Sequence, residues 1–254
     1  MCKEGQLAGG TDQATLPSQA DGGDGAPRSW AGSRRPQLSE DAANYIRNMI
    51  TTGRLSPGEP VRADAIGEDL GISGTPVREA LQALRVEGFL DLMPRKGFVV
   101  APLTGKDIRD IFTAHAMLSG ELAYRAARVA TADDIAELEV LHGDVLTAAS
   151  ATDMALLEAK NHAFHRKLNL LADARKIAWA LGLVTRYTPA LFYASIEGWP
   201  EATVEDHTKI LDTVRSHDAK RARTSMQAHI VNAGELLAQH YDARAAMSRG
   251  TAVR

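Results

Sequence analysis

The segment Ile72–Leu81, with the sequence ISGTPVREAL, constrains the fold of this chain more than any other. Ser73 or Thr75 can cap a helix here, and Pro76 is tolerated in the first turn because its missing N–H has no helical partner there. Four apolar residues then recur at helical spacing: Val77, Ala80, Leu81 and Leu84. The segment therefore predicts a short helix with one buried face.

The opposite face of this helix is polar. It carries Gly74, Thr75, Arg78, Gln82 and Arg85. Downstream, apolar runs at 89–93 and 98–101 flank Pro94-Arg95-Lys96-Gly97, a composition typical of a hairpin turn. A short helix followed by a hairpin with a basic tip is the layout of a winged helix-turn-helix, which predicts DNA binding.

The net charge of the chain does not by itself indicate a nucleic-acid partner. The formal charge is -3, and residues 38–102 contain seven Lys and Arg against nine Asp and Glu. Attraction to phosphate must therefore come from the placement of the cations. Those expected on the DNA side are Arg62, Arg78, Arg95 and Lys96.

The pattern along the chain predicts a mainly α fold with two domains. Residues 1–36 lack apolar periodicity and are expected to be a disordered arm. Residues 37–103 should form the winged helix-turn-helix domain with its small β-hairpin wing, residues 104–245 an all-α domain, and 246–254 a loose tail. Six helices are expected in the all-α domain, near 105–129, 132–149, 152–172, 174–196, 202–216 and 218–242.

The chain shows no sign of an extracellular or membrane location. Cys2 is its single cysteine, so no disulfide can form within one chain. Neither a signal-peptide core nor an apolar run of roughly 20 residues is present. We expect a cytoplasmic protein with no membrane partner.

Three histidines lie on the apolar stripes of three separate predicted helices. They are His165, His207 and His229, and Asn161 precedes His165 by four residues on the same face. Inward-pointing imidazoles from one bundle can bind a divalent metal. Taken singly, each histidine is better explained by packing in the core or at its boundary. Periodicity alone leaves both interpretations open.

The quoted residues resemble two linked families. Ser73–Leu81 is similar to the recognition-helix pattern of the GntR family of bacterial transcription regulators, which covers residues 38–102. The second half resembles the FCD effector domain of the FadR branch of that family. The residues that carry this second resemblance are Asn161, Phe164, His165, His207, Ile210, Leu211, Asp218, Ala222, Met226 and His229.

The resemblance implies a transcriptional regulator, acting as a repressor, that binds double-stranded operator DNA as a homodimer. The implied DNA contacts are Arg62, Ser73, Gly74, Thr75, Arg78, Arg95, Lys96 and Gly97. A divalent metal, zinc or nickel, would be held by Asn161, His165, His207 and His229. A small organic acid or related metabolite would be the effector, with His115, Ser119, Arg186 and Tyr187 as its contacts.

Two positions depart from the family pattern. Asn161 stands where the first metal ligand is usually Asp, so the charge of a bound metal is less compensated. His115 stands where members usually have an Arg that meets a carboxylate. Two other functions therefore stay open beside the ligand-responsive regulator: a metal-dependent enzyme built on the helical bundle, and a regulator that has lost its response to ligand. The sequence contains no carboxylate at a spacing typical of a general base, so we expect a protein that is not an enzyme.

Overall fold

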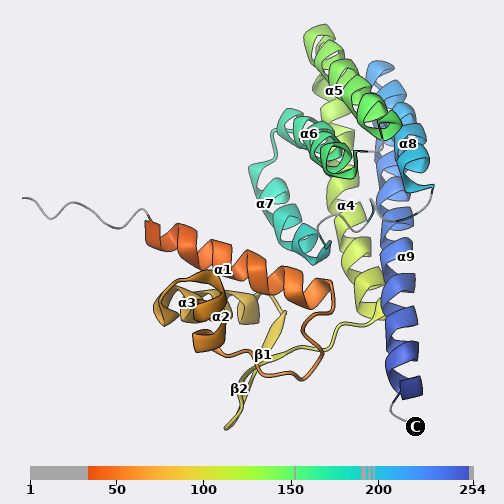
Figure 1. Cartoon of the computed structure of the whole chain (residues 1–254). Coiled ribbons are helices and arrows are strands. Elements are labelled where there is room, and N and C mark those ends of the chain that lie inside the picture. The colour runs from red at the N-terminus through yellow and green to blue at the C-terminus, as the bar shows by residue number, and fades with distance from the viewer. Residues whose placement is uncertain (1–33, 152, 190–192, 194–195, 197, 252–254) are drawn as a thin grey trace, which may run out of the picture.

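The computed structural model describes residues 34–151, 153–189, 193, 196 and 198–251. Over these residues it shows a mainly α fold in which a small helical domain with a hairpin wing precedes a bundle of six helices (Figure 1). The expected fold class is confirmed. The expected arm at 1–33 lies outside the described residues.

The first domain contains three helices and a two-stranded antiparallel sheet. These are α1 (Arg34–Thr51), α2 (Ala63–Leu70), α3 (Gly74–Val86), β1 (Leu90–Met93) and β2 (Gly97–Val100). Leu90 pairs with Val100 and Met93 with Gly97, so the hairpin turn falls where the sequence predicted it. The apolar stripe of α3 is fully buried against α1, with Val77, Ala80 and Leu84 at its centre.

The turn between α2 and α3 depends on two glycines. Gly71 ends α2 in the left-handed region at φ 65°, which an L side chain rarely adopts. Gly67 lies so close to the turn that a Cβ there would be 2.9 Å from the carbonyl oxygen of Ile72. This close approach fixes the angle at which α3 leaves α2.

The second domain is an all-α bundle. Its elements are α4 (Gly105–Val129), α5 (Ala132–Ser150), α6 (Met154–Leu171), α7 (Arg175–Val184), the 3₁₀ turn η2 (Thr185–Tyr187), α8 (Trp199–Arg215) and α9 (Ala219–Thr251). The two longest helices, α4 and α9, lie side by side along much of their length (Figure 1). Gly234 allows this approach, because a Cβ there would be 2.4 Å from the Cβ of Phe112. The helices α5, α6 and α8 pack at one end of this pair.

Two predicted boundaries differ from the structure. The helix expected over 174–196 ends at Val184, and Thr188 is extended because Pro189 disfavours the helical conformation in the residue before it. The helix expected to stop at 242 continues to Thr251, through residues that include the good helix formers alanine, methionine and arginine. Residues 246–251 are therefore helical where a loose tail was expected.

Among the described residues, none of the helices combines the length and apolar character needed to cross a membrane.

Candidate DNA interface and histidine cluster

The recognition helix α3 exposes the side chains that the sequence placed on its outer face. Ser73 precedes the helix in an extended conformation, and its side chain makes no capping hydrogen bond. Thr75 and Arg78 are exposed on the first turns, and Gly74 begins the helix. These residues lie at the amino end of the helix, which is the end that enters the major groove in helix-turn-helix proteins.

The side chain of Arg78 lies near an acid of the preceding helix. Its Nη2 atom lies 3.7 Å from Oδ1 of Asp64 on α2, and both side chains are largely exposed. Exposed pairs contribute little stability, so Arg78 can exchange this contact for a phosphate or a base edge.

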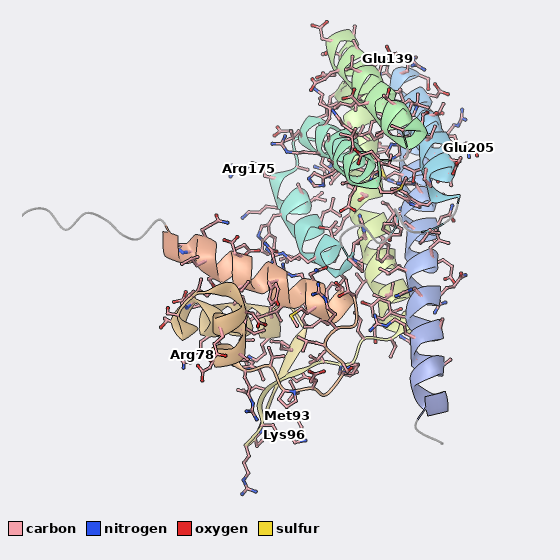
Figure 2. The ribbon with its side chains drawn as sticks, in the orientation of Figure 1. Arg78, Met93, Lys96, Glu139, Arg175 and Glu205 are labelled. Atoms are coloured by element: carbon pink, nitrogen blue, oxygen red, sulfur yellow. The ribbon has the colours of Figure 1, made fainter. Side chains whose placement is uncertain are left out.

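The wing projects away from the domain. Figure 2 shows Arg78 and Lys96 on the side of the first domain that faces away from the bundle. Arg95 and Gly97 both have positive φ, at 65° and 75°, which forms the tight turn and leaves Lys96 exposed at its tip. Arg62 is also exposed, immediately before α2. The predicted cations thus lie on exposed parts of the same domain.

In the bundle, three helices bring three imidazoles together. His165 comes from α6, His207 from α8 and His229 from α9, and one ligand atom of each lies within 4.8 Å of the others. The Nε2 atoms of His165 and His207 are 3.2 Å apart. Ligand atoms around a tetrahedral zinc ion are about 3.3 Å apart, as follows from zinc–nitrogen distances of about 2.0 to 2.1 Å. The distance between these two Nε2 atoms is therefore close to the one that a bound zinc ion requires.

Neighbouring side chains orient these rings. The Nδ1 atom of His229 lies 3.3 Å from Oδ2 of Asp206, and this hydrogen bond lowers the pKa of the Asp206 carboxyl. Phe164 stacks on the ring of His207 with 4.3 Å between centroids. A carboxylate on the second nitrogen of a ligating histidine is the usual arrangement in metal sites. Asp206 was missed in the sequence, although its position directly before His207 was a usable signal.

The protonation states in the histidine cluster suit a bound metal cation, because its donor atoms are uncharged. Burial, together with the other imidazoles, lowers the pKa of His165 and of His207 well below the usual value. Both rings are therefore neutral near pH 7, the form that coordinates a metal. The Oδ1 atom of Asn161 is buried and accepts no hydrogen bond from the protein. A bound metal or a water molecule on a metal would satisfy this oxygen, so the residues present fit a divalent metal.

His115 and Ser119 lie on α4. Burial, with a smaller contribution from His229, lowers the pKa of His115 to about 4. The ring is therefore uncharged near pH 7 and can meet a ligand only as a neutral hydrogen-bonding group. Its Nδ1 atom is buried without a hydrogen-bond partner, and Ser119 is buried.

The structure places Arg186 and Tyr187 against the first domain. Arg186 forms an ion pair with Glu87, and the hydroxyl of Tyr187 donates to the backbone carbonyl of Glu87. The ring of Tyr187 also stacks on Phe89, with 4.3 Å between centroids. These two residues were expected beside the effector, whereas in the structure they contact Glu87 and Phe89 at the end of the recognition helix. Nothing in the sequence near Glu87 indicated this pairing.

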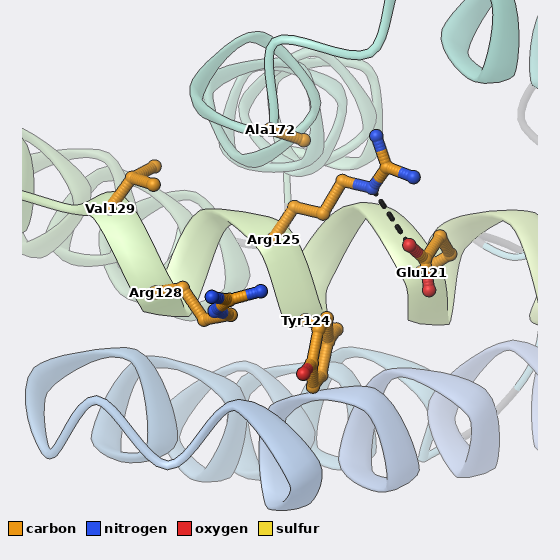
Figure 3. A pocket seen from close by; sticks show the side chains of 6 residues that line it. All are labelled: Glu121, Tyr124, Arg125, Arg128, Val129 and Ala172. Atoms are coloured by element: carbon orange, nitrogen blue, oxygen red, sulfur yellow. Dashed lines mark hydrogen bonds and ion pairs between the residues drawn. The ribbon is translucent and has the colours of Figure 1, made fainter.

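A shallow depression on α4 is a second feature of the bundle surface (Figure 3). It is lined by Glu121, Tyr124, Arg125, Arg128, Val129 and Ala172. Its two arginines already have partners, since Arg125 donates to Glu121 at 2.7 Å and the guanidinium of Arg128 lies over the ring of Tyr124, 5.7 Å from its centroid. We assign no ligand to this depression.

Comparison with known proteins agrees with this geometry. The gntR family of bacterial regulatory proteins matches residues 38–100, and the FCD domain matches residues 110–232. An uncharacterized HTH-type transcriptional regulator of Agrobacterium vitis is 31% identical over 130 residues, which are 50% of this chain and 76% of that protein. The HTH-type transcriptional repressor GlaR of Escherichia coli is 25% identical over 205 residues, covering 76% of this chain and 92% of GlaR. The solved structure of E. coli McbR/YncC has a TM-score of 0.62 at 24% identity and covers 80% of this chain and 98% of that chain.

The fold and the exposed recognition helix thus define a DNA-binding regulator of transcription. The chain belongs to the GntR family, in the branch whose second domain is an FCD domain. Its relatives are regulators of transcription, which confirms that the protein is not an enzyme.

Proposed function

We propose that this protein is a ligand-responsive repressor that binds a pseudo-palindromic operator as a homodimer in the bacterial cytoplasm. The observation that carries the proposal is the exposed amino end of α3, with Arg78 beside an exposed basic wing. Two such heads related by a two-fold axis would match an operator with two half-sites. That GlaR is a repressor supports the same role here.

The histidine cluster supports a divalent metal as part of the proposed effector site. His165, His207 and His229 would hold zinc or nickel, with Asn161 as a neutral oxygen donor. The metal would supply a positive charge that binds one end of a small organic acid. His115 and Ser119 of α4 would contact the remainder as neutral donors. An effector that binds one arrangement of the heads more tightly shifts the population toward it.

The Arg78→Ala variant tests the DNA contact. We expect operator binding to weaken by about 1 to 3 kcal/mol, because a recognition-helix arginine that contacts a base edge contributes about this much. Affinity would be measured by fluorescence anisotropy, with an operator selected from random DNA by the wild type. Arg175→Ala, an exposed arginine at the start of α7, is the matched control and should bind like the wild type. Unchanged affinity for Arg78→Ala at moderate salt would contradict the proposed docking.

The Asn161→Asp variant tests the proposed metal ligand. A carboxylate at this position compensates part of the charge of a dication, which a neutral amide cannot do. We expect zinc affinity to rise by about tenfold or more, equivalent to about 1.4 kcal/mol. Competition titration against a zinc-binding dye would measure the change. An unchanged affinity would mean that residue 161 does not ligate the metal, while a wild type that binds no zinc at all would favour a regulator without a metal-dependent response.

A further inference from the structure

The end of the recognition helix is held by side chains from both domains. Glu87 caps α3, and its side chain is only 12% exposed. Its Oε2 atom accepts from Nη2 of Arg47 on α1 at 2.9 Å, and its Oε1 atom pairs with Arg186 of η2. Tyr187 adds a hydrogen bond to the Glu87 carbonyl and a ring stack on Phe89. We call these five residues the Glu87 junction.

The junction divides its two cations between the domains. Arg47 belongs to the first domain, and its side chain is 8% exposed, whereas Arg186 belongs to the bundle and is 34% exposed. A carboxylate left buried without a partner is costly, but Glu87 would keep Arg47 if Arg186 moved away. The first domain can therefore exchange its contact with the bundle and remain folded. A contact that can break and re-form without unfolding either domain can transmit a movement of the bundle to the first domain.

A second contact lies at the end of α1. The carbonyl oxygen of Thr51 accepts hydrogen bonds from the hydroxyl of Tyr241 and from Nη1 of Arg244, each at 3.2 Å, and both donors belong to α9. The first domain is thus attached to the bundle at two separated points. If the contact at Thr51 stays in place, movement of η2 would rotate the first domain about it.

Tyr193, which follows η2 in the chain, contacts α8 and α9, two of the helices that carry the histidine cluster. Tyr193 donates to the carbonyl of Ala233 on α9 and stacks on Trp199, the first residue of α8, with 5.5 Å between centroids. Helix α8 carries His207 two turns later. On the other side, α7 packs against α4, which carries His115. A change in the position of α4 would therefore move η2, because α7 and η2 both pack against α4.

We propose that Glu87 is a positioning residue through which the bundle sets the orientation of the recognition helix. Arg186 and Tyr187 are the bundle's contacts in this device. The inference rests on the proposed dimeric operator binding, because the orientation of each head matters most when two heads must meet two half-sites at a fixed distance. The Glu87 junction makes no predicted contact with DNA. A change in the junction should therefore alter which spacing between half-sites the protein prefers, and it should leave the affinity for a single half-site unchanged.

Full-length Arg186→Gln tests this inference on a set of duplexes. Each duplex carries two copies of a half-site, selected from random DNA by the wild type, separated by a different number of base pairs. The wild type should prefer one spacing. In Arg186→Gln we expect the preference for that spacing over the next best to fall by about fivefold or more, while affinity for a single half-site stays within about twofold. Arg186→Lys, which keeps the charge but not the guanidinium fork, should give an intermediate result.

A control variant and a second measurement separate the possible outcomes. Arg175→Gln changes an exposed arginine of α7 outside the junction and should keep the wild-type spacing preference. Hydrogen exchange at the amides of residues 84–89 should be faster in Arg186→Gln than in the wild type. This local measurement detects the loosened end of α3 even if the variant is also less stable overall. An unchanged spacing preference and unchanged exchange would overturn the inference and leave the proposed function intact. A wild type that sediments as a monomer on every duplex contradicts the proposed function and, with it, the inference.

Discussion

The His207→Ala variant should bind zinc at least about 100-fold more weakly than the wild type, because it removes one of three converging imidazoles from a site with few other donors. His207 is fully buried and its Nε2 atom lies 3.2 Å from that of His165, so its replacement removes a donor from the interior of the cluster. We expect about one metal ion per wild-type chain and none in the variant. Metal content by mass spectrometry and zinc affinity by calorimetry would measure the effect.

His162→Ala is the matched control for this prediction. His162 lies on α6 within one turn of His165, but its side chain is exposed to solvent. Its removal should leave both stoichiometry and affinity unchanged. Equal loss of metal in the two variants would mean that the bound ion sits on surface histidines, and retention of metal by His207→Ala would remove the buried cluster from the proposed site.

Metal-free protein should lose stability steeply as the pH falls below about 6.5. Burial lowers the pKa of His115, His165 and His207 in the folded protein, and that of His115 falls to about 4. The unfolded chain therefore binds more protons than the folded chain in this range, so acid favours unfolding. Three such groups give a slope of up to about 4 kcal/mol per pH unit between the unfolded and the folded pKa values. The stability that they contribute is fully present above the unfolded pKa and is lost as the pH falls toward the folded values.

Urea unfolding of chelator-treated protein at pH 7.5, 6.5 and 5.5 would measure this slope. The His115→Leu variant removes one of the three groups and should reduce the slope by about one third. Zinc should protect the wild type, since a bound metal stabilises the folded state and keeps the imidazoles neutral. A free energy of unfolding that does not change over this range would show that the rings take up protons in the folded protein.

The recognition helix was predictable because its signals are local. The start near Ser73, the tolerated Pro76 and the stripe at Val77, Ala80 and Leu84 all lie within 12 residues, and the structure shows a helix at Gly74–Val86. The hairpin was predictable for the same reason, since Pro94 and Gly97 lie at its turn. Apolar spacing also indicated that three histidines face the interior, and the structure brings them within 4.8 Å.

Other features depended on neighbours that are distant in the sequence. Arg186 and Tyr187 lie on a segment that was expected to be part of one long helix, but Pro189 ends that helix early, and η2 then meets Glu87 almost 100 residues away. Asp206 was passed over although it orients His229 from the adjacent helix. The contact of Arg78 with Asp64 likewise depends on the turn between α2 and α3, which is set by the close packing at Gly67.

The sequence by itself determined the mainly α class, the winged helix-turn-helix and the inward direction of the histidine stripes. These properties follow from residues that are neighbours in the chain, because periodicity, capping and turn chemistry are short-range effects. The tertiary structure alone decided that Glu87 is shared between the two domains and that Asp206 supports the histidine cluster. Such contacts depend on how whole helices pack, since a buried charge pairs with whichever opposite charge the fold brings within reach.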